Sequence, residues 1–198
     1  LSSYATFVFP WYMALLFVLA GISARLALRK KTNREFIRER ISKLLIPLIA
    51  GICSIVALMA YYADKFHNGY QGNFFTHYSV FFTKYTDLTG YDGGWSPGHL
   101  WFLMYLFVIS MICLLLIGLQ KRLMPGFSFG TMSFLGLVGL VLLFPCASML
   151  LNIGGKSIGL YMLLYLIGYY IIVEDNVMEK IVKYRCMCLL IFIVSDVA

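Results

Sequence analysis

Three apolar runs without a charged residue, 7–24, 44–62 and 100–119, constrain the fold of this chain more than any other feature. An α-helix rises about 1.5 Å per residue, so each run is close to the length that crosses a hydrocarbon core of ~30 Å. Apolar residues make up 61 % of the sequence and charged residues 13 %, against ~25 % charged residues in soluble domains. The sequence therefore predicts an all-α, polytopic transmembrane helix bundle.

Hydropathy extends this pattern beyond the three runs. Residues 131–151 and 158–173 are expected to cross as well, although the latter is short for a span, and residues 186–198 begin a further apolar run. We expect about five complete spans and a truncated sixth in one domain, 1–198. Because the chain begins without Met and ends within an apolar run, we also expect it to be a fragment of a longer protein.

Basic residues concentrate between the first and second runs. Eight Lys and Arg residues lie between Arg25 and Pro47, with Glu35 and Glu39 as the acidic residues among them. Short loops with such an excess stay on the cytoplasmic side of a membrane. The net charge of +7 is therefore a topology signal, with phospholipid or an anionic cofactor as counter-charge, and does not indicate nucleic acid.

Within this part, residues 29–43 are predicted to form a cytoplasmic basic connector and an interfacial helix. Thr32 and Glu35 have the spacing of a capping box, which predicts a helix start near Asn33. Arg38, Arg40 and Lys43 then lie on a helix that enters the membrane near Pro47. They are candidate ligands for phosphate groups, and the alternative is that they are ordinary membrane-surface anchors.

The segment 63–97 is predicted to be extracytoplasmic. Its aromatic residues recur at helical spacing, which predicts an amphipathic helix half sunk in the outer leaflet. A lid over a substrate groove is the alternative. His67 and His77 have no carboxylate at ligand spacing, so we expect solvated side chains and no metal site.

A strong helix start follows this segment. Ser96 and Pro97 are typical of the N-cap and first position of a helix. His99 is then held in the first turn, where the helix dipole favours a neutral imidazole. It is a candidate acceptor-side base, and Trp101 a candidate substrate contact; both residues are also common at a membrane interface.

Two motifs together resemble a known family. They are the stretch from Phe36 to Pro47, which follows Leu19-Ala20-Gly21, and the sequence Gly98-His-Leu-Trp-Phe-Leu103. The pair resembles acyltransferase family 3, integral membrane O-acyltransferases. The resemblance implies transfer of an acyl group, often acetyl, from cytoplasmic acyl-coenzyme A to a hydroxyl of an extracytoplasmic carbohydrate or small acceptor, with no metal.

The resemblance also assigns residues. The family's basic Arg-x-x-Arg pair matches Arg40 and Lys43, and lysine lacks the bidentate fork of arginine. The family's base histidine lies on a helix that precedes the first run and is not in this sequence, so residues 1–198 alone are expected to be inactive.

Two other classes of membrane protein remain open: a multi-span transporter and a non-catalytic lipid-binding scaffold. Ion-coupled carriers usually hold ionisable residues at mid-membrane, whereas these runs are uncharged through their centres. The leading hypothesis is an acyltransferase of a bacterial or archaeal plasma membrane that acts on the cell envelope, with membrane lipids and a glycan or small hydroxyl compound as partners.

Overall fold

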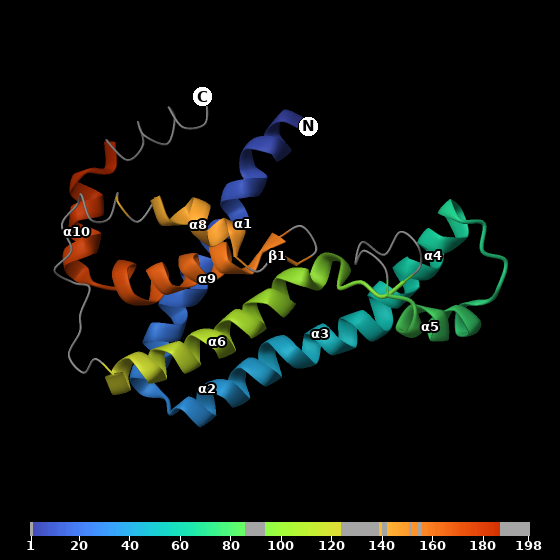
Figure 1. Cartoon of the computed structure of the whole chain (residues 1–198), viewed down its shortest axis with the longest axis horizontal. Helices are drawn as coiled ribbons and strands as arrows, with labels where there is room; N and C mark the ends of the chain where they lie inside the picture. Colours follow the sequence, from blue (N-terminus) through green and yellow to red (C-terminus); the bar gives the residue numbers. More distant parts are fainter. Residues whose placement is uncertain are drawn as a thin grey trace. The chain divides into compact units, whose positions relative to one another are not determined.

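The computed structural model describes residues 2–85, 94–123, 139, 142–150, 152–153 and 156–186. The regular secondary structure of these residues is helical apart from a two-stranded β-pairing of two residues each (Figure 1). The elements are α1 (Ser2–Lys30), α2 (Asn33–Arg40), η1 (Ile41–Leu45), α3 (Ile46–Gly51), η2 (Ile52–Val56), α4 (Ala57–His67), α5 (Phe74–Thr83), η3 (Gly98–Leu100), α6 (Trp101–Leu123), α8 (Leu143–Met149), β1 (Asn152–Ile153), β2 (Lys156–Ser157), α9 (Ile158–Ile167), η5 (Gly168–Ile172) and α10 (Asp175–Lys183).

Three helices among the described residues are long and apolar enough to cross a membrane. They are Tyr12–Lys30, Asn33–His67 and Gly98–Leu123. Each overlaps one of the runs at 7–24, 44–62 and 100–119, so the prediction of an all-α chain with membrane-spanning helices is confirmed at this level.

The expected count of five complete spans is not confirmed. The run at 158–173 forms a shorter apolar helix, Ile158–Ile172, which at about 1.5 Å per residue falls short of a ~30 Å hydrocarbon core. The run at 131–151 is described only in part, chiefly as α8, and residues 187–198 lie outside the described residues.

The chain forms two compact units, and the first contains α1, α8, α9, η5 and α10. In this unit α1 packs against α9 and η5 so closely that the helix backbones are in contact. A Cβ added at Gly21 would overlap the carbonyl oxygen of Tyr165, and one at Gly168 would overlap that of Val18. Small residues allow such close approach between apolar helices. Gly21 and Gly168 therefore allow α1 to lie close to α9 and η5.

The second unit is built on one continuous helical rod, α2 to α4 (Figure 1). The capping box is confirmed, since the Thr32 N–H donates to Glu35 Oε2 (2.8 Å) and the Glu35 N–H donates to Thr32 Oγ1 (3.3 Å). However, the helix does not stop between the connector and the span.

The continuity follows from the backbone around Pro47. Proline cannot donate to the carbonyl four residues earlier, and its ring crowds that carbonyl. The chain forms the π-helical turn η1 just before Pro47, and in this turn the Ile46 N–H donates to the Ile41 carbonyl. Such a turn lets a helix pass a proline without breaking. The helix that was expected to enter the membrane near Pro47 therefore continues past the proline without a break.

The core of the second unit forms where α5 and the start of α6 pack on the rod. Helix α5 folds back beside α4 (Figure 1). Leu100, Leu103 and Met104 of η3 and α6 pack against the same apolar cluster. The buried members of the cluster are Leu48, Ile52, Val56, Ala57, Ala60 and Phe81.

Candidate functional site

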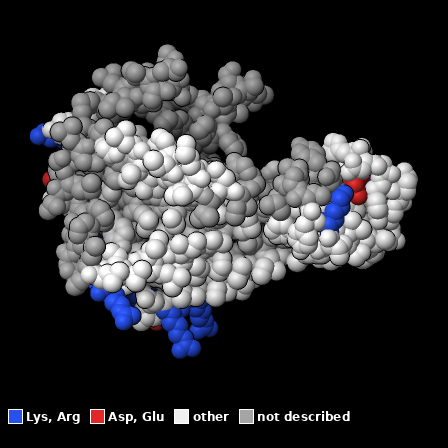
Figure 2. Space-filling view, viewed as in Figure 1, with Lys and Arg blue, Asp and Glu red and all other residues white. Residues whose placement is uncertain are grey.

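The first candidate group lies on α2 and η1. The guanidinium carbon of Arg40 lies 4.8 Å from the ring centroid of buried Phe36. Lys43 donates from Nζ to Glu39 Oε1 one helical turn earlier, and Arg38 is exposed. Figure 2 shows Lys and Arg side chains gathered along the edge at which α2 lies in Figure 1. The helix therefore presents a cationic surface at the start of an apolar rod.

The pairing of Lys43 with Glu39 does not remove Lys43 from this surface. The Lys43 side chain remains 71 % exposed, and exposed pairs four residues apart contribute only about 0.3–0.5 kcal/mol. A hydrogen bond to a charged group contributes about 1.5–3 kcal/mol. The weak pairing with Glu39 therefore leaves Lys43 accessible to an anion from solvent.

The second candidate group begins α6. The predicted helix start takes the form of the 3₁₀ turn η3, whose N-cap residue is Pro97. The Gly98 N–H donates to Oγ of buried Ser96 (3.0 Å). His99 is exposed in this turn. Trp101 is half-buried, with its ring 5.4 Å from that of Tyr105 in edge contact. His99 has no carboxylate ion-pair partner among the described residues.

The structure does not bring the two groups together. A Cβ on Gly98 would touch Val56, which places η3 beside the rod sixteen residues beyond Arg40. At about 1.5 Å per residue this is roughly 24 Å along the helix. The cationic surface and His99 are therefore separated by a distance close to the thickness of a ~30 Å hydrocarbon core.

A third group was missed by the sequence analysis. His77 on α5 is fully buried, and its Nε2 lies 3.1 Å from Oδ2 of Asp64 on α4. The other carboxylate oxygen of Asp64 accepts from Asn68 Nδ2 (2.8 Å). The expectation of a solvated His77 without a carboxylate was wrong, because α5 folds back and brings His77 to a residue thirteen positions earlier.

Aromatic rings enclose this pair. The imidazole of His77 lies 5.5 Å from the ring of Tyr61 and 5.0 Å from that of Tyr70, both in edge contact. His77 Nδ1 is buried and has no hydrogen-bond partner in the described part of the chain. An unpaired buried polar atom lowers the free energy of unfolding by about 1–3 kcal/mol, so a hydrogen-bond donor at Nδ1 would remove this cost.

A signal for His77 was present in the helical spacing. His77 is three residues after Phe74 and four before Phe81, so it lies on the same face as both. Phe81 is fully buried. The aromatic spacing predicted α5 but was taken to leave the histidine in water, whereas His77 belongs to the buried stripe.

Helix α5 is held to the rod at a second point. The Tyr78 hydroxyl donates to the Cys53 carbonyl (3.1 Å). Desolvation, and then the neighbouring Cys53, raise the pKa of Tyr78 above its usual value. The hydroxyl therefore stays protonated as a donor, and α5 holds His77 over Asp64.

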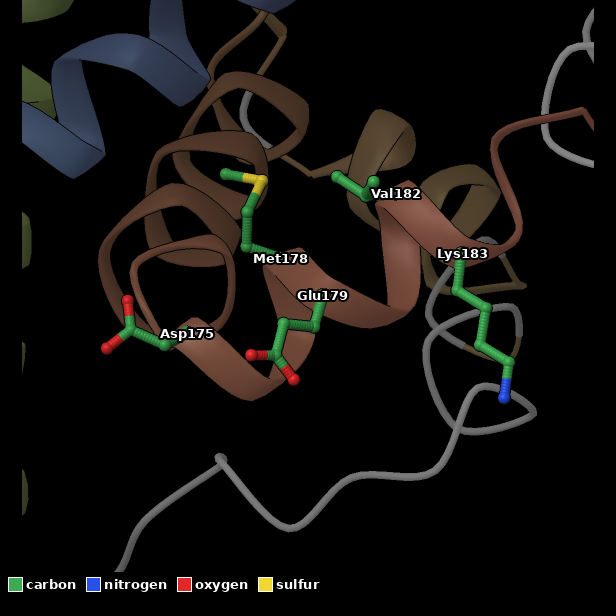
Figure 3. Close-up of a pocket in the computed structure, with 5 residues that line it drawn as sticks. All are labelled: Asp175, Met178, Glu179, Val182 and Lys183. Atoms are coloured by element: carbon green, nitrogen blue, oxygen red, sulfur yellow. The ribbon is translucent and has the colours of Figure 1, made fainter.

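A shallow hollow lies on α10 (Figure 3). Asp175, Met178, Glu179, Val182 and Lys183 line it, all from this one helix. No second element among the described residues supplies a converging group, so the hollow does not form a reactive centre. The described residues also contain no cluster of three or more His, Cys, Asp or Glu that could hold a metal ion.

Comparison with known proteins adds one finding. A family model described as an acyltransferase domain, of the acyltransferase 3 type, matches residues 1–196. No curated protein and no solved structure matches the chain significantly. The match includes all three candidate groups.

Proposed function

This chain belongs to the acyltransferase 3 family, and from that premise we propose that it moves an acyl group, acetyl in the first instance, from acyl-coenzyme A to a hydroxyl of an extracytoplasmic carbohydrate or small acceptor. In this reaction the hydroxyl oxygen bonds to the thioester carbon, the carbon–sulfur bond breaks, and the hydroxyl proton is transferred so that coenzyme A leaves as a thiol. Family membership itself implies a membrane acyltransferase.

The observation that carries the proposal is the capped basic helix at the start of the rod. Arg38, Arg40 and Lys43 lie within two turns of helix, and coenzyme A carries phosphate and pyrophosphate groups. Arginine and lysine bind such groups through charge-assisted hydrogen bonds. Arg40 is held by Phe36, which limits the rotamer freedom lost when a phosphate binds.

The acceptor would bind toward the other end of the rod. General-base assistance typically accelerates attack by a hydroxyl about 100- to 10,000-fold. His99 is an exposed imidazole at that end and remains a candidate base, with Trp101 as a candidate acceptor contact.

We further propose a bacterial or archaeal plasma membrane as the location, with residues 29–43 cytoplasmic and 63–97 extracytoplasmic. The charge distribution supports this orientation, because the basic residues concentrate in the first connector. Membrane lipids would cover the exposed apolar side chains of the rod, such as Ile49 and Ile55.

The donor site is tested by comparing Arg40→Ala with Arg29→Ala in the full-length protein. Removal of a charge-assisted contact should raise the KM for acetyl-coenzyme A about tenfold or more for Arg40→Ala. Arg29, exposed near the end of α1, serves as the control and should change the KM less than about twofold. Transfer of radiolabelled acetyl groups to envelope glycans in membrane vesicles measures both, with the rates corrected for protein amount. Equal losses in the two variants would assign the basic residues to membrane anchoring instead.

A further inference from the structure

We propose that the His77–Asp64 pair and its aromatic neighbours bind the acceptor by accepting a hydrogen bond from a sugar hydroxyl at His77 Nδ1. This inference rests on the proposed acyltransferase function and names a site for the acceptor. The hydroxyl bound here is distinct from the one that is acylated, so no proton transfer is assigned to His77.

The tautomer of His77 follows from its partner. An ionised carboxylate can only accept hydrogen bonds. His77 Nε2 therefore carries the hydrogen directed at Asp64 Oδ2, and in the neutral imidazole Nδ1 is left as an acceptor with a free lone pair. A carboxylate that fixes one nitrogen of a histidine orients the other toward its ligand.

The partner that Nδ1 requires is a donor. Both oxygens of Asp64 are already engaged, by His77 and by Asn68. Lys65, the residue after Asp64, does not donate to His77 Nδ1. Its Nζ lies 5.9 Å from the ring centroid of Tyr61. A neutral hydroxyl can donate to Nδ1 without bringing a buried charge, which would be costly to desolvate.

The surroundings fit a sugar among hydroxyl compounds. Tyr61, Tyr70 and Phe74 form a set of edge contacts around the imidazole and one another. Binding sites for small molecules combine such aromatic walls with a few placed polar groups. Because Nδ1 is buried, a hydroxyl reaches it only when a ring moves aside. Tyr70 is the ring neighbour that lies on the connection between α4 and α5, outside a helix.

The position in the fold agrees with an acceptor site. Asp64 is 24 residues beyond Arg40 on one continuous helix, or roughly 36 Å at about 1.5 Å per residue. This separation exceeds the ~30 Å hydrocarbon core. The proposed sugar site and the proposed donor site therefore lie on opposite sides of the membrane, and a hydroxyl bound at His77 is remote from the donor phosphates.

Two substitutions separate ligand binding from a purely structural role. In His77→Gln the amide nitrogen takes the place of Nε2 and can still donate to Asp64, but no acceptor remains at Nδ1. In His77→Asn the amide carbonyl can occupy the Nδ1 position, while the contact with Asp64 is lost. A structural pair predicts that Asn is the more harmful change to thermal stability; a sugar site predicts that Gln is the more harmful change to binding. His67→Gln is the matched control, because His67 is exposed.

The experiment uses the full-length protein in lipid nanodiscs, without acetyl-coenzyme A. Saturation-transfer NMR with glucose and N-acetylglucosamine should show binding to the wild type. His77→Gln should weaken it about tenfold or more, whereas His77→Asn should weaken it less and His67→Gln should leave it unchanged.

Three results would overturn the proposal: no saturation transfer from the wild type to either sugar, equal binding by His77→Gln and wild type, or failure of both His77 variants to accumulate while His67→Gln accumulates normally. Acetyl transfer is assayed separately on the same wild-type preparation. Transfer without sugar binding at His77 would reject this site and keep the proposed function, and sugar binding without transfer would reject the function.

Discussion

Gly21 is a residue at which the first unit leaves no room for a side chain. A Cβ at this position would overlap the backbone carbonyl of Tyr165, so Gly21→Ala must push α1 away from α9. Overpacking typically costs about 1–3 kcal/mol. We expect a lower thermal unfolding midpoint in detergent and less protein in the membrane. Gly118→Ala is the control, because a Cβ on Gly118 in helix α6 meets nothing within 4 Å; a similar loss in both variants would contradict the close-packing explanation.

Single residues were predictable where their own chemistry decided their role. Thr32 is a cap, as its type and spacing indicated, and Ser96 accepts from the Gly98 N–H at the start of η3. Partners from distant parts of the chain were not predictable. Arg25 was predicted only as one of the basic residues that indicate topology, yet its guanidinium lies 5.2 Å from the ring centroid of Tyr169 and 3.9 Å from Glu174 Oε1. Which residues meet across helices depends on how the helices pack, and hydropathy does not contain that information.

At the scale of elements, starts and apolar lengths were predictable, and the route past Pro47 was not. A proline after a basic stretch is compatible both with a break and with a π-helical turn. The structure has the turn, and it also has a second one, η2, in the same rod. Helix α5 was predicted from its aromatic spacing. The sequence did not predict that α5 folds back onto α4 and buries His77, because the connection between the two helices does not indicate the direction in which α5 runs.

Replacing Pro47 tests whether the π-helical turn matters for the donor site. In Pro47→Ala the new N–H can bond to the Lys43 carbonyl, so the turn should revert to α-helix. A π-helical turn contains about one residue more than an α-helical turn, and each residue of an α-helix turns by about 100°. Reversion to α-helix therefore rotates Arg38 and Arg40 by about 100° relative to the buried residue Leu48. We expect unchanged or higher thermal stability, since proline disfavours helix interiors by ~3 kcal/mol, together with a KM for acetyl-coenzyme A several-fold higher. Ile49→Ala, at an exposed position in the same helix, is the control. An unchanged KM would show that the phase of the basic residues is unimportant.

For the whole molecule, composition and run length predicted a membrane protein built of helices, and the three longest helices lie where the uncharged runs indicated. The number of crossings was less predictable, because a helix such as Ile158–Ile172 is near the lower limit of spanning length. The two ends of the rod also differ in how far they could be predicted. The basic end was found by its charge, whereas the His77–Asp64 pair depends on tertiary packing of two residues that are unremarkable in sequence.

The orientation of the rod gives the last prediction. The helix Asn33–His67 contains 35 residues and is thus roughly 52 Å long, more than the ~40–45 Å of a whole bilayer. Its two ends must therefore emerge on opposite sides if it crosses. In a background without native cysteines, Phe75→Cys, at a position that is 83 % exposed, should react with a membrane-impermeant maleimide on intact cells. Asn33→Cys should react only after the membrane is opened, because the basic residues around it favour the cytoplasm. Labelling of both cysteines on intact cells, with a cytoplasmic marker protein unlabelled, would refute the proposed topology and with it the placement of donor and acceptor on opposite sides.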